Sequence, residues 1–192
     1  MISKVDNAVL DAIRTRRSVR TFTSQPVTDE QVQAVLEAGR WAPSALNSQP
    51  WDFIVVKDSE TRSKMAHILR RVTVAWGGFS GAPVTIVVSV DAKRDPAHHV
   101  EDGAAAAQNM CLAAHSMGLG SSWAGIYSGR VRRGSAEYAL KKLLALPASH
   151  RIVAVVPLGV ANGNGNGHES ARIPLQEMVH NDRFTPRQRY LS

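Results

Sequence analysis

The 192-residue sequence has a single cysteine, Cys111, and few aromatic residues, which make up 6% of it. One cysteine excludes an intrachain disulfide and any metal site built from several thiolates. Because Cys111 lies in an apolar stretch of helical character, we expect a buried, unreactive thiol. The aromatic residues are not interleaved with the arginines, as they would be on a face that stacks single-stranded nucleic acid.

Long apolar runs are also missing. The longest ones, such as 84–88, fall far short of the roughly 18 residues that a membrane-spanning helix requires. Residues 1–7 lack the basic-then-apolar order of a secretory signal. We therefore expect a cytoplasmic protein with no membrane contact. Its length and its 44% of apolar residues suit one domain over 1–192.

Several catalytic signatures are absent as well. No GxxxxGK[ST], GxGxxG, GxSxG or HExxH pattern occurs, which argues against a P-loop, a dinucleotide fingerprint, a hydrolase nucleophile and a zinc protease. The adjacent histidines His98 and His99 point to different faces of a helix, so we expect a solvated helix start there and no metal site.

Basic residues outnumber acidic ones, 23 to 16, for a formal charge of +7. The arginines cluster within 14–20 and 183–189. Such an excess is compatible with nucleic-acid binding, with attraction for small anions, or with simple solubility. Neither a zinc-finger nor an RNA-recognition signature is present, so we expect no nucleic-acid partner, and a basic binding protein stays an alternative.

Hydrophobic periodicity predicts helices that alternate with strands, as in a mixed α/β or an α+β domain. The helices are expected over 4–16, 29–41, 59–71, 100–117 and 135–146, and the strands over 51–57, 84–90 and 151–160. Thr28 and Gln31 fit a capping box, and Ser135 fits an N-cap. Gly118 and Gly120 are expected to end the fourth helix.

The remaining segments have weaker patterns. The fourth helix is apolar on most of its surface, which places it inside the fold or in an interface. Glycine-rich connections are expected at 77–83 and 161–168, and a short helix after Pro174. The tail to Ser192 has no core pattern of its own. Each of the four tryptophans is expected to pack in the core.

Two segments offer polar groups to a ligand. Segment 16–20, RRSVR, presents three guanidinium groups and a hydroxyl, which suit a phosphate dianion. A solvated cationic helix end is the alternative interpretation. Segment 43–51, PSALNSQPW, presents hydroxyls and amides that both donate and accept, as a heterocycle with carbonyls and ring nitrogens requires. An ordinary connecting loop is the alternative there.

A third segment, 118–125, has the sequence GLGSSWAG. Its closely spaced small residues let a backbone approach a flat ligand. These segments, in order along nearly the whole chain, resemble the nitroreductase family of flavoproteins. Segment 16–22 is similar to the family's RRSxRxF motif and 42–53 to APSxxNxQPWxF. Segment 102–123 resembles its central helix and following turn, and 172–180 the RxPLxExVH ending.

The resemblance implies an α+β fold with a central, mostly antiparallel sheet flanked by helices, built as an intertwined homodimer with FMN at the subunit interface. Arg16, Ser18 and Arg20 would bind the phosphate and ribityl chain, with the backbone of Arg17. Arg172 would reach the phosphate from the other end of the sequence. The partner subunit would bring the loop residues Pro43, Ser44, Ala45 and Asn47, with Gln49 in support. The backbone at Trp123, Ala124 and Gly125 would face the flavin N5 edge.

The implied activity is hydride transfer from NADH or NADPH to FMN and then to a small acceptor such as a nitroaromatic or quinone. No catalytic side chain is required for it. A specialised relative that fragments flavin or removes halogen, and a basic FMN- or nucleic-acid-binding protein, are the alternatives. Two features differ from the family pattern. Gly159 is not followed by the usual Gly-x-Pro element, and the region between 84–90 and the central helix is short.

Overall fold

The computed structural model describes residues 7–72, 79, 81–163 and 171–184. The predicted connections at 77–83 and 161–168 fall partly outside these ranges. So do the first residues of the predicted helix at 4–16 and most of the basic cluster at 183–189.

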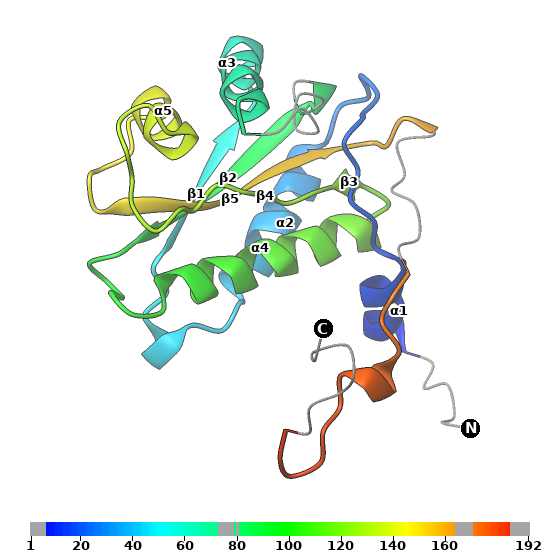
Figure 1. Cartoon of the computed structure of the whole chain (residues 1–192). Coiled ribbons are helices and arrows are strands. Elements are labelled where there is room, and N and C mark those ends of the chain that lie inside the picture. The colour runs from blue at the N-terminus through cyan, green and yellow to red at the C-terminus, as the bar shows by residue number, and fades with distance from the viewer. Residues whose placement is uncertain (1–6, 73–78, 80, 164–170, 185–192) are drawn as a thin grey trace.

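The centre of the fold is an antiparallel sheet (Figure 1). Its strands are β1 (Trp51–Val56), β2 (Val84–Asp91), β3 (Gly120–Ser121), β4 (Ala124–Gly125) and β5 (His150–Gly159). β1 pairs with β2, β2 pairs with β5, and the two short strands both pair with β5. Every residue of β2 from 84 to 90 is buried, because the sheet is covered on both faces.

Helices cover the two faces as the α+β prediction requires. The helices are α1 (Ala8–Thr15), α2 (Asp29–Arg40), α3 (Ser59–Arg70), α4 (His99–Ser116) and α5 (Ala136–Leu143). Figure 1 shows α2 and α4 on one face of the sheet and α3 and α5 on the other. The core is divided in the same way, with one apolar cluster around α2 and α4 and a second one around α3 and α5.

Local signals placed several helix ends correctly. The capping box is confirmed, because Gln31 N donates to Thr28 Oγ1 at 3.2 Å and Thr28 N donates to Gln31 Oε1 at 3.0 Å. Ser135 caps α5 by accepting from Tyr138 N at 3.2 Å. The short helix predicted after Pro174 is a single 3-10 turn, Leu175–Glu177.

The glycines after α4 have two different roles, and one prediction was wrong. Gly118 takes a φ of 74° directly after α4, so it ends the helix as predicted. Gly120 lies in β3 instead, where a Cβ would come within 2.8 Å of a Val19 methyl group. Gly120 is therefore required for the close packing of residues 16–22 on the sheet, and does not end the helix.

The central helix α4 lies against the sheet. Its buried residues include Ala106, Ala107 and Met110, and a Cβ at Gly103 would come within 2.8 Å of Val90 and Val153. Cys111 is buried, which confirms that part of the prediction, and burial raises the pKa of its thiol.

The C-terminal segment 171–184 extends away from the body of the molecule (Figure 1). It exposes several large apolar side chains, namely Ile173, Leu175, Met178, Val179 and Phe184. Large apolar groups gathered on an exposed segment are typical of a contact with another protein chain. Among the described residues, no helix has the length and apolar character needed to cross a membrane.

Candidate functional site

The arginine segment packs against the turn that follows α4. After α1 ends at Thr15, the chain runs beside β3, where Val19 N donates to Ser121 O at 2.8 Å. Ser18 forms an isolated bridge with Ser121, and Val19 is buried. Val19 thus anchors the segment, while Arg16, Arg17 and Ser18 stay half-buried and Arg20 is exposed. The structure therefore brings together the first and third segments that the sequence singled out.

A cavity of about 290 Å³ opens at this junction. It is lined by Thr15, Arg17, Val19, His115, Gly118, Leu119, Gly120, Ser121 and Ala161. Among the described residues, no carboxylate lines it. Arg17 lines the cavity and Arg16 lies beside it, so the region is electropositive, and burial together with these two charges lowers the pKa of His115. Such a region attracts an anion.

The guanidinium of Arg17 is partly engaged by the backbone. Its Nη1 donates to Arg14 O at 2.6 Å and to Arg16 O at 3.1 Å, next to the C-terminal end of α1. Nearby, Thr15 Oγ1 and His115 Nε2 are 2.7 Å apart, which ties the end of α1 to α4. These contacts fix where the arginine segment leaves the helix.

The turn between β3 and β4 is open on one side. A Cβ at Gly125 would meet nothing closer than Trp123 Nε1 at 3.8 Å, so another molecule can approach the backbone there. Ala124 is buried and pairs with Val155 of β5. Ser122 Oγ is buried and has no hydrogen-bond partner within the part of the chain that the structure describes. A buried hydroxyl of this kind is a candidate contact for a ligand.

The loop 43–50 contains a 3-10 turn, Ala45–Asn47, and is cross-linked by its own polar groups. Gln49 N donates to Ser44 Oγ at 3.0 Å, and Gln49 Nε2 donates to Asn47 Oδ1 at 3.1 Å. Pro43, Asn47 and Gln49 are exposed, and Leu46 is fully exposed. The loop thus presents an ordered and mostly polar surface that another molecule can contact.

Within one chain, this loop and the arginine segment do not meet. Ala45 is bonded to Asp102 near the start of α4, whereas Thr15 contacts His115 near its end. These two points of the helix are about 20 Å apart, at ~1.5 Å per residue. Arg172 belongs to the exposed C-terminal segment 171–184. One chain therefore holds the predicted site residues in separate places.

Sequence reasoning missed Asp102 and Arg94, which hold the loop, and His115, which lines the cavity. An acidic residue at 102, in the first turn of an otherwise apolar helix, was the available signal for the first of these. The expected solvated helix start is correct for His98, which is exposed, and wrong for His99. His99 is buried, with its Nδ1 2.8 Å from Asp95 O. The described residues contain no group of three side chains suited to a metal ion.

The exposed side of α4 contributes to an apolar groove of about 400 Å³ shared with α1 and α2. It is lined by Ala8, Val9, Ala12, Ala38, Trp41, Asn109, Leu112, Ala113 and Ser116. Trp41 is 71% exposed and Trp123 is 37% exposed, so their predicted places in the core were wrong, whereas Trp51 is buried as predicted and Trp76 lies outside the described residues. An apolar groove with an exposed tryptophan at its edge is typical of a protein interface.

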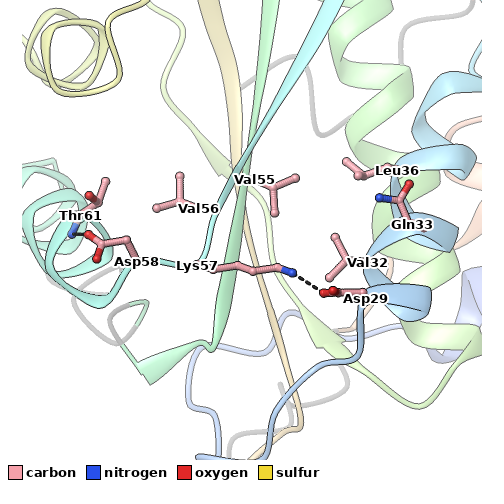
Figure 2. Close-up of a pocket in the computed structure, with 9 residues that line it drawn as sticks. All are labelled: Asp29, Val32, Gln33, Leu36, Val55, Val56, Lys57, Asp58 and Thr61. Atoms are coloured by element: carbon pink, nitrogen blue, oxygen red, sulfur yellow. Dashed lines mark hydrogen bonds and ion pairs between the residues drawn. The ribbon is translucent and has the colours of Figure 1, made fainter.

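A second groove, of about 650 Å³, lies between α2, β1 and α3 and contains none of the predicted site residues (Figure 2). Its charged groups already serve the fold. Lys57 is paired with Asp29, and Asp58 caps α3 by accepting from Thr61 N at 2.7 Å. The geometry therefore favours the junction of the arginine segment and the glycine turn as the functional site.

Comparisons with known proteins point to one family. The model of the nitroreductase family matches residues 13–75 and 69–160. A protein of Methanothermobacter thermautotrophicus, assigned as an NADH dehydrogenase/NAD(P)H nitroreductase, is 36% identical over 161 residues, 82% of this chain and 78% of that protein.

Two solved structures are similar over almost the whole chain. A protein of Parabacteroides distasonis with the same assignment has a TM-score of 0.82 and 30% identity, over 93% of this chain and all of that one. A nitroreductase of Desulfovibrio desulfuricans in complex with FMN has a TM-score of 0.74 and 36% identity, over 94% of this chain and all of that one.

Proposed function

Because this chain belongs to the nitroreductase family of NAD(P)H-dependent flavin oxidoreductases, we propose that it binds FMN and reduces a small nitroaromatic or quinone. The observation that carries the proposal is the hydrogen bond from Val19 N to Ser121 O, which joins an arginine segment to a glycine turn. This junction places cationic groups for a phosphate next to a backbone that can approach a flat ring. The FMN complex of the Desulfovibrio desulfuricans relative supports the choice of cofactor.

The residues present fit FMN. Arg16, Arg20 and Arg172 supply positive charge for the phosphate, and Ser18 supplies a hydroxyl. The backbone at Trp123, Ala124 and Gly125 is open to the edge of a ring, and the buried Ser122 hydroxyl would gain a partner. When bound, FMN accepts a hydride from NADH or NADPH and delivers it to the acceptor. The chain needs no acid or base of its own for this role.

We propose that the functional unit is an intertwined homodimer with FMN between the subunits. Along α4, about 20 Å separates Asp102, which holds the loop, from His115, which contacts Thr15. A single chain therefore cannot bring its loop to the cavity beside its own arginine segment. In a second copy, Pro43, Ser44, Ala45 and Asn47 can reach the flavin bound by the first. The apolar groove at Trp41 and the exposed apolar residues of segment 171–184 supply surface for the contact.

Turnover in the presence of an acceptor tests the activity. The protein is purified, given FMN, freed of unbound flavin and mixed with NADPH or NADH and either a nitroaromatic or a quinone. Oxidation of the nicotinamide that depends on the acceptor is the expected result. Retained FMN without oxidation of either nicotinamide would favour a specialised flavin chemistry and contradict the proposed reaction.

A mixed dimer tests whether the site is shared. Arg16→Ala removes a phosphate ligand, and Asn47→Gly removes a loop side chain while tolerating the left-handed backbone, φ 55°, at that position. The two variants are produced together with different tags, and the heterodimer is isolated. If sites are shared, one site carries both changes and the other carries neither, so the heterodimer binds one FMN tightly. If each site lay within one chain, both sites would be damaged and binding would stay as weak as in the parents.

A further inference from the structure

The loop 43–50 is held from outside by two residues with no assigned role, Asp102 and Arg94. Asp102 Oδ1 accepts from Ala45 N at 3.1 Å, and Asp102 Oδ2 accepts from Ser48 Oγ at 3.3 Å. Arg94 Nη1 donates to Gln49 O at 2.9 Å. The loop is therefore attached at its middle to α4 and at its end to the segment that follows β2.

The backbone of the loop needs such support. Leu46, Asn47 and Gln49 have φ values of 51°, 55° and 46°, in the left-handed region that disfavours residues with a Cβ. Strained backbone of this kind persists only where the surrounding structure fixes it, and it concentrates at functional sites. Hydrogen bonds within the loop cross-link it. The bonds to Asp102 fix it relative to α4, and the bond from Arg94 fixes it relative to the segment that follows β2.

Asp102 is well suited to this role. It is 5% exposed and lies in the first turn of α4, where the helix dipole favours a negative charge. No salt bridge reaches it from the residues that the structure describes, so the two loop donors and the helix end are what stabilise the buried carboxylate. A buried carboxylate without its hydrogen bonds is costly, which ties the loop firmly to the helix.

We infer that Asp102 is a positioning residue that presents the Asn47 side chain and the Ser44–Ala45 backbone to the FMN of the partner subunit. This inference rests on the proposed function. Arg94 holds the Gln49 end of the same loop, and Gln49 in turn donates to Asn47 Oδ1. The carboxylate touches neither FMN nor the acceptor, and acts through the loop alone.

Substitution of Asp102 tests the role, with Glu101→Ala as a matched control. Glu101 lies in the same first turn of α4, is exposed, and loses the same charge. Asp102→Ala should raise the dissociation constant of FMN about tenfold or more, since it removes two bonds to a charged group. Its bound flavin should also have a visible spectrum closer to that of free FMN. Glu101→Ala should change neither.

Two milder variants keep the test open if Asp102→Ala fails to fold. Asp102→Asn can still accept from Ala45 N and can donate to Ser48 Oγ, so it should restore most of the affinity. Ser48→Ala leaves the carboxylate with one donor and should weaken FMN binding by an intermediate factor. A dissociation constant for Asp102→Asn as high as for Asp102→Ala, or an unchanged one for Ser48→Ala, would overturn the role.

A heterodimer separates positioning from a general loss of stability. In a dimer of Asp102→Ala with Arg16→Ala, one site keeps both the wild-type loop and the wild-type arginine, so one FMN should bind tightly. A chain that is merely destabilised by Asp102→Ala would damage both sites, and no tight site would remain. Wild-type protein that binds no FMN would overturn the proposed function itself. Tight binding by wild type and an equally tight Asp102→Ala homodimer would overturn only the positioning role.

Discussion

The backbone amide of Val19 donates to the carbonyl of Ser121 at 2.8 Å, and this bond joins two segments that are far apart in the sequence. It fixes the arginines of residues 16–20 beside the turn that follows α4. The close approach depends on Gly120, whose missing side chain leaves room for Val19. The cationic and the glycine-rich elements therefore form one site.

Removal of an arginine should weaken the hold on FMN. Arg16→Ala or Arg20→Ala should raise the dissociation constant of FMN about 10- to 100-fold, since each removes charge-assisted bonds worth about 1.5–3 kcal/mol. Fluorescence titration of apoprotein with FMN measures the change. Arg70→Ala, an exposed arginine at the end of α3, is the control and should have no effect. Equal affinities in all three variants would mean that the phosphate binds elsewhere.

A methyl group at Gly120 should displace the arginine segment. The Cβ of Gly120→Ala would lie 2.8 Å from a methyl group of Val19, so Val19 and its neighbours must shift. We expect lower thermal stability and weaker FMN binding. Gly129→Ala is the control, because a Cβ there would meet nothing within 4 Å. Wild-type behaviour of Gly120→Ala in both measurements would contradict the packing described for residues 16–22.

The imidazole of His115 should make the stability of the apoprotein depend on pH. Burial and the charges of Arg16 and Arg17 lower its pKa below the ordinary 6.5. The folded chain then binds fewer protons than the unfolded chain just below that pH, so the free energy of unfolding decreases as the solution is acidified. Denaturant unfolding between about pH 7 and pH 5 measures the slope around the His pKa.

His115→Gln should reduce this slope, because the side chain can no longer take up a proton. His67→Gln, at an exposed position of α3, is the control and should keep the wild-type slope. The explanation fails if the slope of His115→Gln equals that of the wild type.

The pair of Glu137 and Arg151 should be important for stability alone. Glu137 is buried and accepts from Arg151 Nε at 2.8 Å, from Arg151 Nη2 at 3.0 Å and from Ile152 N at 3.1 Å. Glu137→Ala leaves these donors without their acceptor and should lower the free energy of unfolding by about 3 kcal/mol. Glu60→Ala, which breaks the exposed pair with Lys64, should cost no more than about 0.5 kcal/mol. Similar losses in the two variants would contradict the burial of Glu137.

Local sequence signals predicted most of the fold. The N-termini of α2 and α5, at Thr28 and Ser135, could be predicted because an N-cap side chain bonds to residues only a few positions away. The strand at 84–90 could be predicted because a strand buried on both faces is mostly apolar, here with Thr85 and Ser89 as the exceptions. The five helices and the strands β1, β2 and β5 follow from hydrophobic periodicity within a few residues at either end, whereas the two-residue strands β3 and β4 were not predicted.

Contacts between distant segments were less accessible. The bond of Asp102 to Ala45, the burial of His99 and the packing of Gly120 on Val19 depend on tertiary structure, which periodicity does not describe. Trp41 was expected in the core because of its size, yet it is exposed at the edge of an apolar groove. That exposure is compatible with the homodimer proposed above.

Anaerobic reduction of the purified protein tests whether the chain is an NAD(P)H-dependent FMN reductase. The protein is saturated with FMN, freed of unbound flavin and titrated with NADPH and, separately, NADH, while the visible absorbance is recorded. We expect the flavin absorbance to remain with the protein after unbound flavin is removed. It should be lost when at least one nicotinamide is added and should return on addition of a nitroaromatic or quinone. A protein that stays colourless after incubation with FMN would contradict this expectation.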